Sequence, residues 1–223
     1  MFAGHVGVGL AIGRVERRIN VGVFVASALL LDFVLWLFVL GGVESVSIPS
    51  DFAATHQSRF VFPYSHGLVA AIVWSVLAGA LAFWLCSRLA RERWRAGLLV
   101  GAAVCSHWWL DALVHRPEMP LAGSASATVG LALWNHMPAA LAVEVVIAVL
   151  GLYLFLSGSG LARGKSAGLA VLGVVVIVFT VVGMTVAPAP SSAPAMAGSS
   201  LATLALVSAL FVWLGRTSRA RQA

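Results

Sequence analysis

Residues 21–42 read VGVFVASALLLDFVLWLFVLGG, an apolar run with a single charged side chain, Asp32. A helix rises about 1.5 Å per residue, so this run is long enough to cross the roughly 30 Å hydrocarbon core of a bilayer. The whole chain has the same character, because 61% of its 223 residues are hydrophobic and only 10% are charged. A soluble domain has about 25% charged residues. The solvent around this chain is therefore predicted to be lipid.

The pattern of apolar runs predicts an all-α fold, a polytopic transmembrane helical bundle of about six spans. The predicted spans are residues 21–42, 65–87, 97–115, 137–157, 166–187 and 199–215. Residues 1–13 are apolar but too short to span, since a helix of about 12 residues rises only about 18 Å. They are predicted to form a half-helix that pairs with residues 21–42 and brings His5 to the depth of Asp32.

The basic residues predict the orientation of these spans. The formal net charge is +6, and nucleic-acid binding is not expected, because basic residues in membrane proteins flank the spans on the cytoplasmic side. If each run crosses once, all but two of the 14 basic residues fall on one side, and only Arg59 and Arg116 fall opposite. The chain is therefore predicted to be an integral, multi-pass protein of the bacterial inner membrane, with its C-terminus in the cytoplasm.

Ionisable residues inside the spans indicate where function resides. They are costly there, at about 2.5–3.5 kcal/mol for an Asp at a helix centre. The first four spans nevertheless contain Asp32, His66, His107, Asp111, His115 and Glu144, whereas the last two contain none. Residues 1–157 are therefore predicted to form a membrane-embedded metal-site domain. Residues 158–223 would add two packing or anchoring spans and a short basic tail.

The strongest local motif lies in the third span, in the stretch SHWWLDALVH that ends at His115. His107, Asp111 and His115 are four residues apart, so they lie nearly on one face of a helix. Imidazole and carboxylate ligands at this spacing suit zinc or a similar divalent ion. The alternative is a hydrogen-bonded polar pair between helices, without a metal. One helix cannot complete a coordination shell, and the candidate partners are His5, Asp32 and His66.

Two further positions are open to more than one interpretation. Glu144, in the fourth span, is a candidate second-site ligand, general base or supporting partner, and the alternative is a protonated, hydrogen-bonded side chain. His66 opens the second span, where Ser65 or Tyr64 is predicted to cap the helix. His66 would lie near the outer interface and His107 deeper, so a tilted helix or an unwound helix start would be needed to bring them together.

Four short blocks then match a known family in order and spacing. They are Gly4-His5, Leu31-Asp32, Ser65-His66, and Ser106-His107 with Asp111. Over roughly residues 1–157 the chain resembles the YdjM-like family of membrane-bound metal-dependent hydrolases, which is similar to zinc-dependent phospholipase C. The resemblance implies that His5, Asp32, His66, His107 and Asp111 bind one or two divalent metal ions, with zinc expected and Asp111 able to bridge them.

The leading functional hypothesis is hydrolysis of a lipid or phosphoester at the outer side of the membrane. A zinc-like ion would activate water and polarise an ester oxygen. Asp32 or Glu144 would accept the proton, and His115 is a further catalytic candidate. Arg59 and Arg116, as the basic residues on that side, would hold a substrate phosphate.

Two rival functions remain open from the sequence. One is a transporter of metal ions or protons, which needs polar groups lining a route to both faces. Residues 97–104 of the third span have no polar side chain, which argues against such a route. The other is a non-catalytic membrane subunit with a structural metal site. The sequence predicts the lipid bilayer as a partner and does not reveal whether a partner protein exists.

Overall fold

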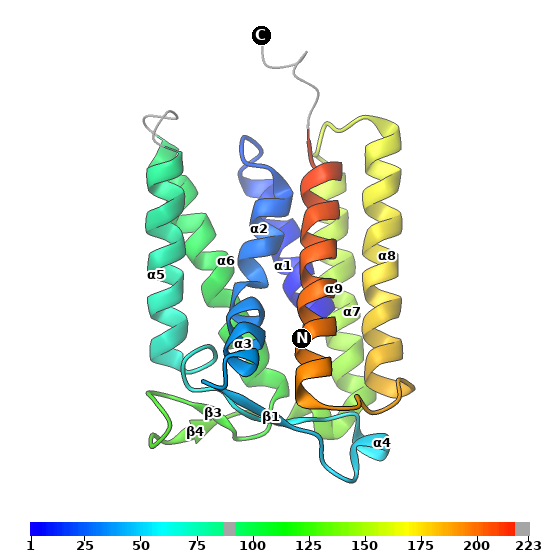
Figure 1. Ribbon diagram of the computed structural model, residues 1–223. Coiled ribbons are helices and arrows are strands. Elements are labelled where there is room, and N and C mark those ends of the chain that lie inside the picture. Colours follow the sequence, from blue (N-terminus) through cyan, green and yellow to red (C-terminus); the bar gives the residue numbers. More distant parts are fainter. Residues whose placement is uncertain (87–91, 217–223) are drawn as a thin grey trace.

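The predicted apolar runs form a bundle of roughly parallel and antiparallel helices (Figure 1). The computed structural model describes residues 1–86 and 92–216. Its helices are α1 (Phe2–Val15), α2 (Val21–Ala28), α3 (Leu30–Leu40), α5 (Leu68–Leu85), α6 (Arg93–Val114), α7 (Met137–Leu156), α8 (Arg163–Thr185) and α9 (Ala193–Leu214). Within the described residues, five helices are long and apolar enough to cross a membrane, and counting the bent pair α2–α3 as one span gives six. The predicted fold class is confirmed.

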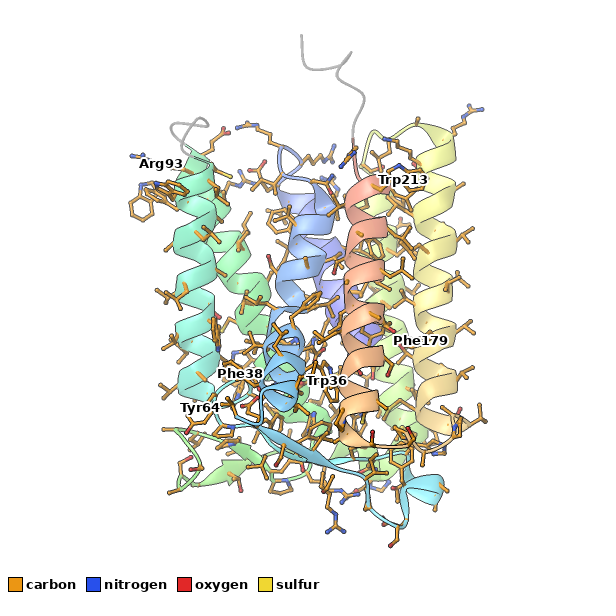
Figure 2. The ribbon with its side chains drawn as sticks, in the orientation of Figure 1. Trp36, Phe38, Tyr64, Arg93, Phe179 and Trp213 are labelled. Atoms are coloured by element: carbon orange, nitrogen blue, oxygen red, sulfur yellow. The ribbon has the colours of Figure 1, made fainter. Side chains whose placement is uncertain are left out.

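The outer surface of the bundle is apolar where a soluble protein would be polar. In α8, Val171, Val174 and Phe179 are each more than half exposed, and α5 presents a similar row of valines and leucines. Exposed aromatic side chains lie at both ends, such as Trp213 at one end and Tyr64 at the other (Figure 2). An apolar belt between two aromatic rims matches the hydrocarbon core and its two interfaces. The fold therefore defines an integral, multi-pass membrane protein.

The described basic residues separate between the two ends of the bundle as predicted. Arg59 and Arg116 lie at the end that carries the short strands. At the opposite end lie Arg14, Arg17, Arg18, Arg93, Arg95, Arg163, Lys165 and Arg216. Arg88, Arg91, Arg219 and Arg221 lie outside the described residues. Which of the two ends faces the cytoplasm stays a prediction.

The first predicted span is not one straight helix. α2 ends at Ala28 and α3 begins at Leu30, and their axes differ by 49°. At the break, the carbonyl oxygen of Ala28 accepts a hydrogen bond from Nδ1 of His107, at 2.7 Å. Kinks without proline commonly arise where a side chain bonds into the helix backbone. The bend therefore coincides with a contact from the third predicted span.

Two helix ends differ from prediction in ways that matter for the site. α5 begins at Leu68 after the N-cap residue Gly67, and no side chain caps it, so the predicted cap by Ser65 or Tyr64 is wrong. His66 consequently lies in the turn before the helix, which is the unwound start that its meeting with His107 requires. α6 ends at Val114, and His115 follows with an extended backbone, so the predicted helical stripe stops at Asp111.

The last helix begins earlier than predicted. α9 starts at Ala193, because the Ser192 hydroxyl accepts a hydrogen bond from Ala195 N and Pro194 occupies the first turn, where it needs no amide hydrogen. α9 packs on α2 and α3, and α8 packs on α7. Buried residues from Ala3 to Phe211 form one continuous apolar cluster. The division into domains at residue 157 stays a prediction.

Two segments outside the spans cover one end of the bundle (Figure 1). The first contains strand β1 (Ser45–Ser47), the short helix α4 (Phe52–Thr55) and strand β2 (Arg59–Val61). Strands β1 and β2 are antiparallel, with Ser45 opposite Val61. The second contains strands β3 (Met119–Pro120) and β4 (Thr128–Val129), and a 3-10 turn, Leu133–His136, that leads into α7. The first segment contains the buried polar residues Glu44, Gln57 and Ser58.

The short helix α1 enters the bundle and packs against α2 as predicted, and against α7. Its contact with α7 depends on two glycines, Gly7 and Gly151. A Cβ atom on Gly151 would collide with the carbonyl oxygen of Gly7, and one on Gly7 would lie 2.5 Å from the carbonyl oxygen of Ile147. Small residues allow helix backbones to approach closely in membranes. This contact fixes the position of His5.

Replacing Gly151 with alanine tests this packing. We expect Gly151→Ala to be destabilised by about 1–3 kcal/mol, because overpacking forces the two backbones apart. The matched control is Gly183→Ala in α8, where an added Cβ meets no atom within 4 Å. Thermal melts in detergent, followed by tryptophan fluorescence, would measure both. Equal melting midpoints for the two variants would contradict the close contact of α1 with α7.

Candidate metal centre

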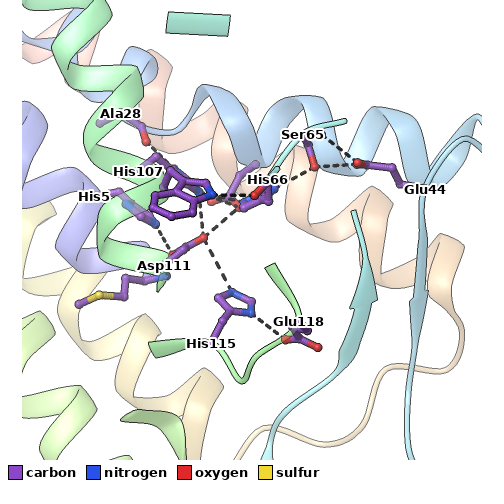
Figure 3. A network of polar contacts seen from close by, with 12 residues as sticks. His5, Ala28, Glu44, Ser65, His66, His107, Asp111, His115 and Glu118 are labelled. Carbon is purple, nitrogen blue, oxygen red and sulfur yellow. Dashed lines mark hydrogen bonds and ion pairs between the residues drawn. The ribbon is translucent and has the colours of Figure 1, made fainter. Parts of the chain in front are cut away.

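Five side chains predicted to bind metal converge beside the bend between α2 and α3. Figure 3 labels four of them, His5, His66, His107 and Asp111. They come from four segments, because α1 carries His5, α3 carries Asp32, the turn before α5 carries His66, and α6 carries His107 and Asp111. Their ligand atoms form two overlapping groups, His5–Asp32–His107 and His66–His107–Asp111, with all atoms of a group within 4.8 Å of one another. These buried groups could hold a metal ion. The depth match expected between His5 and Asp32 is confirmed.

The Asp111 carboxylate lies at the centre of the cluster. Its Oδ1 is 3.0 Å from Nε2 of His5, and its Oδ2 is 3.2 Å from Nε2 of His107 and 3.3 Å from Nε2 of His66. The Met1 nitrogen also lies 2.9 Å from Oδ1. The side chain is 3% exposed, so bulk solvent contributes little to its stabilisation. A carboxylate this buried requires cationic or donor partners.

His107 presents a free lone pair to the cluster. Its Nδ1 lies 2.7 Å from the carbonyl oxygen of Ala28, which can only accept a hydrogen bond. Nδ1 therefore carries a proton, and in the neutral imidazole Nε2 carries the lone pair. This Nε2 faces Asp111 Oδ2 and, at 3.1 Å, Nε2 of His66. A metal ligand held by a backbone carbonyl in this way has a fixed ring orientation.

His66 is held from both of its sides. Its Nδ1 lies 2.9 Å from the hydroxyl oxygen of Ser65, and its own carbonyl oxygen accepts a hydrogen bond from the Trp108 indole at 2.9 Å. The Ser65 hydroxyl in turn lies 2.6 Å from Oε2 of Glu44. The ring is 1% exposed. These contacts aim Nε2 at the same point as Nε2 of His107.

His5 and Asp32 complete the cluster from the other side. The His5 ring stacks on the His107 ring, with centroids 3.7 Å apart and planes 6° apart. Its buried Nδ1 has no hydrogen-bond partner among the described residues. Asp32 Oδ1 lies 3.7 Å from Nε2 of both His66 and His107. Asp32 is the most open member, since 22% of its side chain is exposed.

The separations between the donor atoms fit a small tetrahedral cation. Zinc ligands at about 2.0–2.1 Å from the ion lie about 3.3 Å from one another in a tetrahedron. The Nε2 atoms of His66 and His107 are 3.1 Å apart, and each lies 3.2–3.3 Å from Asp111 Oδ2. Because imidazole lone pairs and a carboxylate repel one another at these distances, a cation or shared protons must balance them. The donor set therefore fits a divalent metal ion.

The two groups overlap rather than forming independent sites. Both include His107, whose Nδ1 is occupied by Ala28, so that Nε2 is its free ligand atom. One imidazole nitrogen has one lone pair and binds one ion. His107 can therefore serve only one ion at a time. A second ion would have to take its ligands from the remaining side chains.

His115 and the two outer arginines lie beside the cluster. Nε2 of His115 is 3.8 Å from Asp111 Oδ2, and its Nδ1 is 2.8 Å from Glu118 Oε1. His115 belongs to neither of the two metal-capable groups. Arg116 follows it and donates from Nε to Gln57 Oε1 at 2.9 Å, whereas Arg59 is exposed on β2. Their predicted catalytic and phosphate-binding roles stay predictions.

Glu144 makes a different contact from those of the metal-capable residues. It is buried in α7, and its Oε2 accepts hydrogen bonds from the backbone nitrogens of Ala3 and Gly4, at 3.1 and 3.4 Å. These are free amide groups at the start of α1, and a carboxylate there also interacts favourably with the helix dipole. Glu144 is in neither metal-capable group. Its observed contacts are those of a capping residue for α1.

Two substitutions test the capping role of Glu144. We expect Glu144→Gln to retain both stability and metal binding, because the amide oxygen still accepts from Ala3 and Gly4. We expect Glu144→Ala to lower stability by about 0.5–2 kcal/mol, the range for a lost helix cap. Thermal melts in detergent measure the stability of both variants, and zinc titration measures the metal binding of Glu144→Gln. If Glu144→Gln has the same lowered melting midpoint as Glu144→Ala, the capping role is contradicted.

Several supporting groups carried no signal in the sequence. Glu44 is the main one, a buried residue before β1 whose Oε1 accepts from the backbone nitrogens of Tyr64 and Ser65, each at 2.8 Å. Burial raises the pKa of the Glu44 carboxyl, and the hydrogen bonds from Ser65 and Tyr64 oppose that shift. Glu118 and the Ala28 carbonyl act on His115 and His107 in the same supporting manner. The one signal in the sequence for any of these supporting contacts is that Ser65 directly precedes His66.

The raised pKa of Glu44 predicts a pH dependence of stability. In the folded protein, the Glu44 carboxyl keeps its proton at pH values above its ordinary pKa of 4.5, so protonation of Glu44 stabilises the fold. That stabilisation is fully present below the ordinary pKa and is lost as the pH rises through the raised, folded value. We therefore expect the melting midpoint of wild type, relative to Glu44→Gln, to fall as the pH rises. Melts between about pH 4 and pH 7 measure this, and a constant difference would contradict it.

The chain matches no family model, no curated protein and no solved structure. The fold and the site together define its class: an integral, multi-pass membrane protein with a buried His/Asp cluster that could hold a metal ion. The resemblance to the YdjM-like family stays a prediction. The residues that carry it are the ones that meet in the cluster.

Proposed function

We propose that the protein is a membrane-bound metal-dependent hydrolase that acts on a lipid or phosphoester at the outer side of the membrane. The observation that supports it most is the group His66–His107–Asp111, whose three ligand atoms lie 3.1–3.3 Å apart in a buried site. Three protein ligands with a fourth position left open are typical of catalytic zinc sites. The resemblance to the YdjM-like family favours the same activity and the same metal.

Each residue has a distinct part in this proposal. His66, His107 and Asp111 hold the ion, and His5 stacks behind His107 to fix its ring. When bound, a zinc-like ion lowers the pKa of a water molecule and polarises an ester oxygen. Asp32 would serve as the proton acceptor at this site, because it is the most exposed member and its Oδ1 lies 3.7 Å from two of the ligand nitrogens. A base must lie within reach of the proton that it removes.

The position of the cluster favours a substrate from the membrane or its outer interface. The segments from Val43 to Tyr64 and from Arg116 to His136 lie over the end of the bundle nearest the site (Figure 1). They carry Arg59 and Arg116, which we propose hold a phosphate by charge-assisted hydrogen bonds. With twelve basic residues predicted toward the other face, this end is the outer one under the positive-inside rule.

The buried surface of α6 favours hydrolysis over transport. Between Arg93 and the cluster, the buried positions of this helix are Ala96, Gly97, Val100, Ala103 and Val104, and all are apolar. An ion or proton route to the opposite face would need polar groups along that path. The lack of such groups at the buried positions of α6 favours an enzyme over a transporter.

Metal analysis and a phosphodiesterase assay on purified protein test the proposal. We expect about one equivalent of bound zinc or a similar ion, and hydrolysis of bis(p-nitrophenyl) phosphate or of phospholipid in mixed micelles. We expect His107→Ala to lose metal affinity by about 100-fold or more, since ligand losses exceed the 10–100-fold typical of supporting residues. Activity should fall in parallel.

The control is His56→Asn, which replaces a histidine outside the cluster. His56 has a φ of 53°, a left-handed conformation that asparagine tolerates. We expect this variant to bind metal and react as wild type does. The proposal would be contradicted if the wild-type protein binds no metal, or if His107→Ala leaves the activity unchanged. Metal uptake into proteoliposomes without hydrolysis would favour the transporter instead.

A further inference from the structure

Glu44 connects to the cluster through a chain of two hydrogen bonds. Its Oε2 lies 2.6 Å from the Ser65 hydroxyl, and that hydroxyl lies 2.9 Å from Nδ1 of His66 (Figure 3). All three side chains are buried. Glu44 precedes β1 in the outer segment and belongs to neither metal-capable group. We infer that Glu44 is the positioning residue for His66, and that it acts through Ser65 to keep Nε2 of His66 unprotonated for metal binding.

The donor and acceptor roles along this chain follow from the number of hydrogens. An ionised carboxylate only accepts, so the single hydroxyl hydrogen of Ser65 points to Glu44. The Ser65 oxygen is then left as an acceptor, and Nδ1 of His66 donates to it. A neutral imidazole carries one N–H, so Nε2 of His66 retains its lone pair. That lone pair points to Asp111 Oδ2 and to Nε2 of His107.

The two oxygens of Glu44 have separate tasks, which makes the role testable. Oε1 accepts from the backbone nitrogens of Tyr64 and Ser65 and so shapes the turn, whereas Oε2 alone contacts the Ser65 hydroxyl. In Glu44→Gln, the amide oxygen can keep both backbone contacts. The amide NH₂ then faces the Ser65 hydroxyl and forces it to accept. The hydroxyl hydrogen turns to Nδ1 of His66, and the imidazole proton moves to Nε2.

This inference rests on the proposed function, in which His66 is a metal ligand, but its first readout does not require activity. Long-range ¹H–¹⁵N correlation spectra of metal-free protein in detergent, with the carboxylate ionised, report which imidazole nitrogen is protonated. We expect Nδ1 of His66 to carry a proton in wild type and to lose it in Glu44→Gln. A His66→Gln sample assigns the signals. Zinc affinity should fall by about 10–100-fold in Glu44→Gln.

A second variant and a matched control separate this role from simple support of the fold. Ser65→Ala leaves both backbone contacts of Glu44 available and removes the relay, so it should also weaken zinc binding and abolish the preference for Nδ1. Glu16→Gln is the control, because Glu16 is a buried glutamate whose Oε1 accepts from Arg18 N at 3.1 Å, at the other end of the bundle. We expect it to leave His66 and the zinc affinity unchanged.

The possible results distinguish this inference from the proposed function. A tautomer change and weaker zinc binding in Glu44→Gln, with no hydrolysis by any variant, would support the positioning role and contradict the hydrolase. An active hydrolase whose His66 tautomer and zinc affinity are unchanged in both Glu44→Gln and Ser65→Ala would overturn the positioning role. Unchanged zinc affinity in Ser65→Ala alone, with a folded protein, would also overturn it.

Discussion

The Asp111 carboxylate joins parts of the chain that are far apart in sequence. Through His5 it contacts α1, through His66 it contacts the turn before α5, and His107 links the same cluster to the break between α2 and α3. A buried carboxylate in an apolar bundle is costly unless donors or a cation surround it. The arrangement of α1 and the first three predicted spans is therefore constrained by one requirement, which is to bring imidazole groups to Asp111. At the bend between α2 and α3, the Ala28 carbonyl oxygen accepts a hydrogen bond from His107 Nδ1 and so directs Nε2 of this ring toward Asp111.

Contacts outside the predicted spans complete the arrangement. The segment before β1 supplies Glu44, which acts on His66 through Ser65, and the segment after α6 supplies Glu118, which contacts His115. In this way two outer carboxylates orient imidazole rings that point inward. Such supporting contacts normally fix the tautomer of a ligand and raise its basicity. The outer segments are thus part of the candidate metal centre as well as a cover for it.

Polar side chains near the cluster are distributed unevenly along the bundle, and this asymmetry bears on function. Buried positions of α6 toward Arg93 are apolar, while Asp32 is partly exposed and the outer segments carry Arg59 and Arg116. Hydrolysis needs a single entrance, an ion with an open position and a nearby base. Transport needs two entrances and a polar route between them. This distribution of polar side chains favours the proposed hydrolase over a transporter.

The sequence by itself determined the membrane-spanning class, the approximate spans, the separation of charge between the two ends, and the set of histidines and aspartates in the cluster. These features depend on composition and local periodicity. A polar side chain inside the lipid is costly, so the few that occur within a span stand out in the sequence as candidates for a functional site. The tertiary structure decided the bend at Leu29, the unwound turn at His66, the capping contacts of Glu144 and the link from Glu44 to His66. Each of these depends on a hydrogen bond between residues in different segments. Hydropathy and spacing along one helix carry no information about such partners.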